Sequence, residues 1–179
     1  MDLRFLVLTT SRLRLAAFGP ADAPEIFAAV TPRVTRFMSF DPEPSLDAFA
    51  RVWPAWLARM AAGEELFLVV RRAENGEFLG VAGLHEIGAA EPTAGLWLKE
   101  SAQGSGYGPE AVAAIIAWAA GGGAEAVRWP VVEANRPSRR LAEGLGGAVV
   151  GTARLRKGAV EYPEIVYRLP ARPGGAGAR

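Results

Sequence analysis

Three glycines within five residues separate a strand-like stretch from a helix-like stretch near the middle of the chain. Gly104, Gly106 and Gly108 follow the extended run 92–100 and lead into 108–121, whose apolar residues recur at helical spacing. Glycine loses more backbone entropy on folding than any other residue, and a tight turn needs only one or two. A strand, a glycine-rich turn and a helix start form an anion site, because backbone N–H groups and the helix dipole face the ligand. The spacing therefore favours a phosphate-bearing ligand over a plain turn.

Two common nucleotide motifs do not fit this turn. The phosphate loop G-x-x-x-x-G-K-[ST] is absent from the sequence. A dinucleotide fingerprint requires G-x-G-x-x-G in an early βαβ unit, whereas these glycines are spaced G-x-G-x-G and follow four predicted strands. Both nucleotide interpretations are weak.

The periodic segments predict one mixed α/β domain over 1–170, without a repeat or a linker. Strands are expected at 12–18, 65–72, 78–87, 92–100 and 124–134, followed by a hairpin over 148–169. Helices are expected at 19–30, 46–63, 108–121 and 136–147. The Pro/Gly/Ala-rich end, 171–179, is expected to be a disordered tail.

Local signals refine four of these boundaries. Ser45 is a candidate helix cap, and Pro54 indicates a kink or a restart within the second helix. Asn75-Gly76 is typical of a hairpin turn. Pro130 indicates that its strand is an edge strand or carries a bulge.

Composition excludes several classes of protein. The 179 residues are half apolar and carry a formal net charge of +1, which implies no basic field for a nucleic-acid backbone. Cysteine is absent, which removes disulfides, thiolate nucleophiles and thiolate metal sites, and His85 is the only histidine. The apolar run 3–8 is too short for a signal-peptide core or a membrane span. We therefore expect a cytoplasmic protein that binds neither nucleic acid nor membrane and holds no metal.

The hexapeptide 103–108, QGSGYG, resembles the Q/R-x-x-G-x-G/A pyrophosphate loop of the GCN5-related N-acetyltransferases, the GNAT superfamily. Its setting is similar to the strand–loop–helix unit of the ribosomal-protein-alanine acetyltransferase-like (RimJ/RimL-type) branch. Further along, EANRPSRRLAEGLGG resembles that branch's N-x-x-S-x-x-x-x-E-x-x-G-F segment, with Asn135, Ser138, Glu143 and Gly146 in place. The opening TSRLRLAAFGPADAPEIF is similar to the branch's first strand and helix. The resemblance covers roughly 9–170. It implies one mostly antiparallel sheet flanked by about four helices and splayed between strands 4 and 5.

The resemblance also implies the chemistry: acetyl-CoA as co-substrate, and direct transfer of its acetyl group to a primary amine without a covalent enzyme intermediate or a metal. Such a transfer needs the thioester beside the amine, a donor for the carbonyl oxygen, and routes for two protons. By resemblance, the backbone of Leu96, Trp97 and Leu98 binds the pantetheine and the acetyl oxygen. The other cofactor-binding residues implied are Gln103, Gly104, Ser105, Gly106, Tyr107, Gly108, Asn135, Ser138 and Arg139.

The sequence departs from the family at two proton-transfer positions. Thr93 stands where the branch often has a glutamate, with Glu91 two residues earlier, and Ala142 stands where many members have a tyrosine acid. Ser138 is the remaining hydroxyl near the thiol, and Glu164 matches an acidic residue common in the last strand. Ser138 and Glu164 are therefore the candidate catalytic residues.

Two function classes follow. One is an active N-acetyltransferase whose acceptor is a protein N-terminus, an amino sugar or another small amine. The other is a non-catalytic acyl-CoA-binding module that kept the loop and lost the proton relay. His85 is interpreted as a structural or pocket-lining residue rather than a base. The sequence fixes neither the acceptor nor the choice between monomer and homodimer.

Overall fold

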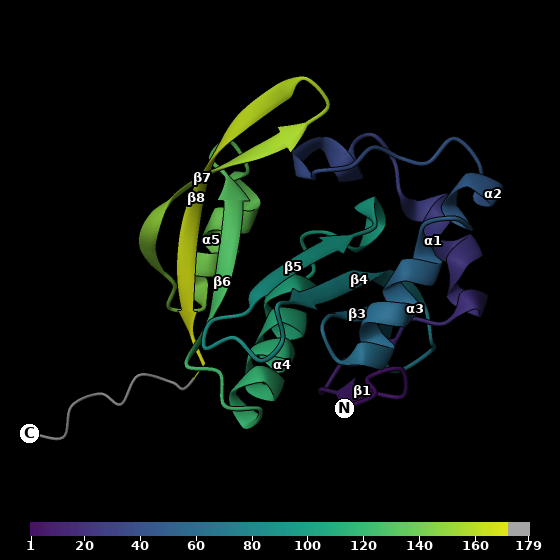
Figure 1. Ribbon diagram of the computed structural model, residues 1–179, viewed down its shortest axis with the longest axis horizontal. Helices are drawn as coiled ribbons and strands as arrows, with labels where there is room; N and C mark the ends of the chain where they lie inside the picture. The colour runs from purple at the N-terminus through teal and green to yellow at the C-terminus, as the bar shows by residue number, and fades with distance from the viewer. Residues whose placement is uncertain (172–179) are drawn as a thin grey trace, which may run out of the picture.

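One eight-stranded sheet runs through the molecule in the order β1-β2-β3-β4-β5-β6-β8-β7 (Figure 1). The computed structural model describes residues 1–171, so 172–179 of the predicted tail lie outside the described residues. All strand pairs are antiparallel except β5 with β6, which confirms the predicted mixed sheet. The strands are β1 Val7–Thr9, β2 Leu13–Ala17, β3 Leu66–Arg72, β4 Phe78–His85, β5 Thr93–Leu98, β6 Ala126–Val132, β7 Ala148–Lys157 and β8 Val160–Pro170.

Helices pack on both faces of the sheet. The α-helices are α1 Ala23–Ala29, α2 Leu46–Phe49, α3 Trp53–Ala62, α4 Tyr107–Gly121 and α5 Arg136–Gly144, and the 3-10 turns are η1 Pro20–Asp22, η2 Val34–Phe37 and η3 Glu100–Ala102. Trp56 of α3 stacks on Phe67 of β3 with ring centroids 4.8 Å apart, whereas α4 packs against Leu96 on the opposite face of β5. Among the helices of residues 1–171, none has both the length and the apolar character needed to cross a bilayer.

Several local signals act as the sequence predicts. The Ser45 hydroxyl accepts a hydrogen bond from the Ala48 N–H at 3.1 Å and caps α2. The predicted second helix is divided in two: α2 ends at Phe49, and α3 begins at Trp53. Pro54 lies in the first turn of α3, where the missing N–H of proline costs no intrahelical hydrogen bond. Gly76 closes the β3–β4 hairpin with φ of 74°. Strand β1 is an addition to the predicted order, because three residues paired only to β2 leave too short a pattern to detect.

The sheet divides between β5 and β6, the fourth and fifth strands of the predicted order. These two strands pair at a single position, Thr93 with Arg128, and then diverge (Figure 1). Just below, Glu91 accepts hydrogen bonds from Arg168 at 2.6 Å and from Arg128 at 3.2 Å. The splay predicted by resemblance is therefore present, and an ion-pair cluster closes its narrow end.

Pro130 helps to keep the strands apart. The Arg128 N–H donates to the Pro92 carbonyl, so residues 128, 130 and 132 of β6 turn their backbone groups toward β5. A parallel ladder would next need an N–H at position 130, and proline has none. The expectation of an edge or bulge needs correcting in detail. β6 is an interior strand paired with β8 without a bulge, but beyond Arg128 its β5-facing side pairs with no strand.

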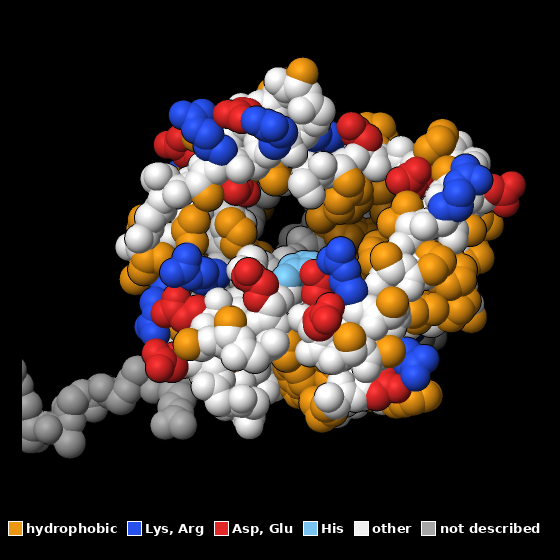
Figure 2. All heavy atoms as spheres, in the orientation of Figure 1, with side chains coloured by type: hydrophobic (Ala, Val, Ile, Leu, Met, Phe, Trp, Pro, Cys, Tyr) orange, Lys and Arg blue, Asp and Glu red, His pale blue; other side chains and the backbone are white. Residues whose placement is uncertain are grey.

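The β7–β8 hairpin reaches back across the open end of the splay. The Lys157 ammonium at its tip donates to the Thr35 carbonyl at 2.9 Å and pairs with Asp41 at 2.8 Å. Both partners belong to the loop between α1 and α2. The space-filling view shows this face hollowed at its centre, with hydrophobic side chains to either side and charged groups gathered below (Figure 2).

Candidate active site

The glycine-rich turn between β5 and α4 uses its glycines in two ways. Gly104 and Gly106 have φ of 78° and 77°, in the left-handed region that glycine adopts without strain. Gly108 is buried, and a Cβ there would lie 3.1 Å from Leu141 and 3.4 Å from Leu96. The first two shape the turn, while the third lets α4 pack closely against β5 and α5.

Backbone N–H groups of this turn are free to bind a ligand. Within residues 1–171, the N–H groups of Gly104, Ser105 and Gly106 donate to no protein acceptor. All three residues are exposed, and they lead directly into the N-terminus of the 15-residue helix α4. Free amides at a helix start, in a turn without blocking side chains, fit a pyrophosphate.

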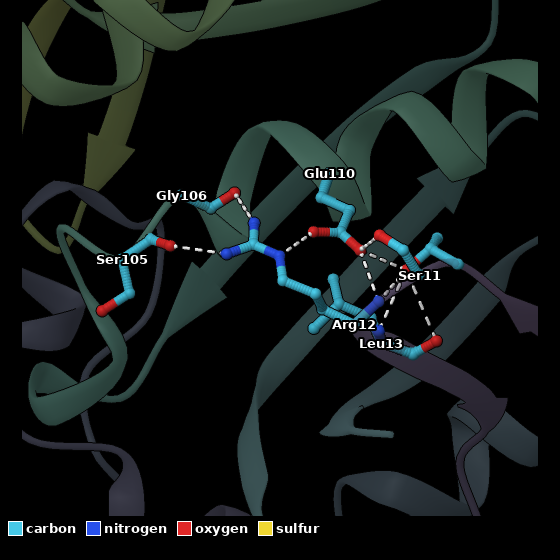
Figure 3. A network of polar contacts seen from close by, with 7 residues as sticks. Ser11, Arg12, Leu13, Ser105, Gly106 and Glu110 are labelled. Atoms are coloured by element: carbon cyan, nitrogen blue, oxygen red, sulfur yellow. Dashed lines mark hydrogen bonds and ion pairs between the residues drawn. The ribbon is translucent and has the colours of Figure 1, made fainter. Parts of the chain in front are cut away.

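Arg12 holds the turn from behind. Its guanidinium donates to the Ser105 carbonyl and to the Gly106 carbonyl, each at 3.1 Å (Figure 3). It also lies 4.9 Å from the Tyr107 ring centroid. Its Nε also donates to Glu110 of α4 at 2.6 Å. Because the carbonyls are bound on one side, the peptide groups are fixed with their N–H ends directed elsewhere.

Glu110 completes this contact between the β1–β2 turn and α4. Its carboxylate accepts from the Thr10 hydroxyl and from the Arg12 backbone N–H, and its side chain is 16 % exposed (Figure 3). Burial raises the pKa of Glu110, but the hydrogen bonds from Thr10 and Arg12 outweigh it and hold that pKa below its ordinary value. The carboxylate is therefore a charged structural anchor of the turn.

The edge of β5 presents backbone groups to the splay at alternate residues. The Lys99 N–H donates to Leu79 of β4, so odd-numbered residues of β5 turn their backbone groups toward β4. The backbone groups of Leu96 and Leu98 consequently face the splay. The backbone of Trp97 instead belongs to the β4 ladder, and its half-buried side chain lies on the face opposite α4, with its ring centroid 5.9 Å from that of Phe78. The Gln103 side chain donates to the Leu98 carbonyl at 3.0 Å, which leaves the Leu98 N–H free.

Asn135 and Ser138 meet at the start of α5. The Asn135 side-chain oxygen accepts from the Ser138 N–H at 3.3 Å, so its amide NH₂ remains available to a ligand. The Ser138 hydroxyl accepts a hydrogen bond from the Trp129 indole at 3.0 Å and retains its own proton to donate. Arg139, one residue on, donates to the Tyr167 hydroxyl at 3.2 Å, an interaction that the sequence pattern does not reveal.

The two candidate carboxylates lie in different surroundings. Glu164 pairs with Val132 at the wide end of the splay, and burial raises its pKa. Glu91 lies at the narrow end, where hydrogen bonds from Arg168 and Arg128 lower its pKa against the effect of burial. Glu91 is thus held as a charged structural group and is poorly suited to accept a proton.

The chain belongs to the GNAT acetyltransferase family. Residues 12–148 match the family model described as an acetyltransferase (GNAT) domain. That span begins at Arg12 and includes the turn, both strands of the splay and α5. A search of curated proteins finds no sequence match.

Solved structures agree in fold. A Vibrio cholerae chain provisionally assigned as a ribosomal-protein-serine acetyltransferase aligns with a TM-score of 0.82 at 19 % identity, covering 95 % of this chain and 99 % of that one. Mycobacterium smegmatis RimJ, in complex with CoA-disulfide, aligns at 0.78 and 15 % identity, covering 89 % and 82 %. Spermidine N-acetyltransferase from Vibrio cholerae, in complex with CoA and spermine, aligns at 0.74 and 15 % identity, covering 89 % and 97 %.

Proposed function

We propose that this protein transfers the acetyl group of acetyl-CoA directly to a primary amine, by way of the splay between β5 and β6. The observation that carries the proposal is the set of free backbone groups along one path. It runs from the N–H groups of Gly104, Ser105 and Gly106 to the inward-facing backbone of Leu96 and Leu98. A pyrophosphate at the first set and a carbonyl oxygen at the second match a thioester of coenzyme A.

The side chains would bind the rest of the co-substrate. Gln103 and Tyr107 hold the shape of the turn, and the Asn135 amide NH₂ would donate to a pantetheine carbonyl. Arg139 of α5 lines a cavity of about 370 Å³ together with Glu133 and Pro163. Its guanidinium is held by Tyr167, so a phosphate contact would use its remaining donors.

Ser138 and Glu164 are the proposed proton-transfer groups. The Ser138 hydroxyl, fixed by Trp129, would donate to the sulfur as the C–S bond breaks. The raised pKa of Glu164 makes its carboxylate a better proton acceptor than an exposed one, and it would act on the acceptor ammonium through water. The acceptor is a protein N-terminus, an amino sugar or a small amine.

The proposal is tested by binding and turnover on the same preparation. Coenzyme A should raise the melting temperature, because a ligand specific for the native state stabilises it by about 2.7 kcal/mol at one hundred times its Kd. Acetyl-CoA with serine- or alanine-initiated peptides, glucosamine or spermidine should release free thiol, with activity retained in a chelator. Without acceptor, no acetylated side chain should accumulate in a quenched sample.

The alternative, a non-catalytic acyl-CoA-binding module, is favoured by Thr93 and Ala142, neither of which can replace the family's acid or base. It would give the same thermal shift but no thiol release with any acceptor. A chain without a shift at millimolar coenzyme A would contradict both functions.

A further inference from the structure

His85 lies where the two strands of the splay begin to part. It ends β4 and pairs with Thr93 of β5, which is the residue that pairs with Arg128 of β6. Directly opposed residues of an antiparallel pair point to the same face, so His85, Thr93 and Gly95 share the face opposite α4. In the space-filling view, the pale blue of the chain's one histidine borders the central hollow (Figure 2).

Two opposed glycines leave room for the imidazole and for a ligand. Gly83 and Gly95 face each other across β4 and β5. The His85 Nε2 lies 3.2 Å from the point that a Cβ of Gly83 would occupy, so the ring leans along the strand over Gly83. A Cβ at Gly95 would meet no atom within 4 Å. The open space in front of Gly95 adjoins Leu96, whose backbone faces the splay.

The other ring nitrogen faces a carboxylate. The Nδ1 of His85 lies 3.4 Å from the Oε1 of Glu65, which also pairs with Arg59 at 2.8 Å. Within the described residues, the Oε2 of Glu65 is buried without a hydrogen-bond partner. Phe67 supports the ring edge-on, with centroids 5.6 Å apart. The imidazole side chain is 38 % exposed. It is thus oriented by packing and by a carboxylate, with Nε2 over Gly83, which lies opposite Gly95 and the open space in front of it.

We infer that His85 accepts a proton from the acceptor amine at Nε2 and that Glu65 positions the ring for this step. The inference rests on the proposed function. The ammonium gives one N–H proton to Nε2, and the freed lone pair forms the C–N bond while the C–S bond breaks. A second N–H proton passes to the departing sulfur by way of Ser138, and His85 then releases its proton to solvent. His85 of β4 thus takes the place of the family's glutamate, where this chain has Thr93. In this step the first proton of the ammonium goes to His85 rather than to Glu164 of β8.

The test uses the untagged chain, in which His85 gives the only imidazole signals. Acetyl-CoA alone should shift these proton resonances, saturating at the concentration that saturates the thermal shift. With whichever peptide, glucosamine or spermidine proves to be the acceptor, His85→Gln should lower kcat roughly a hundredfold while the KM for acetyl-CoA stays within about twofold. Glu65→Gln should lower kcat about tenfold, and the neighbouring, exposed Glu64→Gln should leave it unchanged.

Imidazole signals that acetyl-CoA does not move, or a His85→Gln variant that keeps kcat within about threefold, would overturn the inference. Either result leaves the proposed function intact. A wild-type chain that neither binds coenzyme A nor releases thiol would contradict the proposed function itself.

Discussion

The two walls of the splay are built differently, although both are strands of one sheet. β5 pairs with β4 along its whole length, and the turn that follows it is held by Arg12 and Glu110. β6 pairs with β8, and ionic and hydrogen-bond contacts at the two ends of the splay join this half of the sheet to the other. At the narrow end Glu91 pairs with Arg128 and Arg168, and at the open end Lys157 donates to the Thr35 carbonyl.

The strands further from the splay differ in burial, although β6 itself is more buried than β5. In β4, seven residues from Phe78 to Leu84 are buried, whereas most of β7 is exposed on both faces. A ligand needs a fixed anion site but also room for an acceptor of variable size. The β5 wall therefore provides the fixed anion site, and the β6 wall provides the room for the acceptor. Changes on the β5 side should therefore affect cofactor binding, and changes on the β6 side should affect turnover and acceptor binding.

The largest expected effect is at Gly106 on the β5 side. Gly106→Val places a branched side chain on a left-handed residue, with Arg12 3.4 Å from the new Cβ, and covers the free amides of the turn. Coenzyme A affinity should fall at least about a hundredfold, since the anion site is lost. Calorimetric titration and the thermal shift measure this directly.

Gly123→Val is the matched control for backbone strain. Gly123 also has a positive φ, 95°, but follows the far end of α4 and has open space around its Cβ position. It should lose stability by a similar amount and bind coenzyme A normally. Equal loss of binding in both variants would mean that strain, not the turn, controls affinity.

Ser138→Ala is expected to reduce turnover about ten- to a hundredfold, equivalent to about 1.4 to 2.7 kcal/mol, with little change in acetyl-CoA affinity. The reason is loss of the proton donor to sulfur. Stability should also fall by about 1 to 2 kcal/mol, because the Trp129 indole N–H loses its acceptor. Trp129→Phe breaks the same hydrogen bond and keeps the hydroxyl. If the two variants slow turnover equally, Ser138 is structural and not a donor.

Lys157→Met should have a moderate effect confined to the acceptor. It removes the tie to Thr35 and Asp41 that crosses the open end, so the acceptor KM should change by roughly two- to fivefold. The affinity for coenzyme A should not change, because the anion site lies on the other wall. Arg156→Met, at an exposed neighbour that pairs within the hairpin, is the control. Steady-state kinetics with varied acceptor distinguish the two.

The smallest expected effect is on the pH dependence of stability, through the ion pairs of Glu91 with Arg128 and Arg168. The pKa of Glu91 is lower in the folded protein than its ordinary value, so the unfolded state binds more protons as pH falls. Its stabilising contribution is complete above the ordinary carboxyl pKa and is lost as pH falls through the lowered one. Melting temperature measured from about pH 6 to pH 3 should therefore decline less steeply in Glu91→Gln than in wild type. Parallel curves for the two proteins would contradict the role of the cluster.

Local features of the fold and site were predictable from the sequence, and long-range ones were not. The glycine turn, the Ser45 cap and the hairpin at Gly76 depend on residues within a few positions of one another. Arg12 and Glu110 are separated by 98 positions, and no periodic pattern links a strand's first residue to a helix four strands later. An arginine at the start of the predicted strand 12–18 and a glutamate two residues after Gly108 were the only signals available. For the same reason, the sequence did not predict that Arg128 and Arg168 pair with Glu91.

Pro130 has a consequence for solubility as well as for shape. An open strand side inside a sheet presents unpaired backbone groups and invites a strand from another molecule. On β6 the next hydrogen-bond donor that such a strand would need is missing, so an incoming chain can form no continuous ladder there. The opening can thus admit a small extended molecule with few backbone contacts and still resist pairing between copies of the protein.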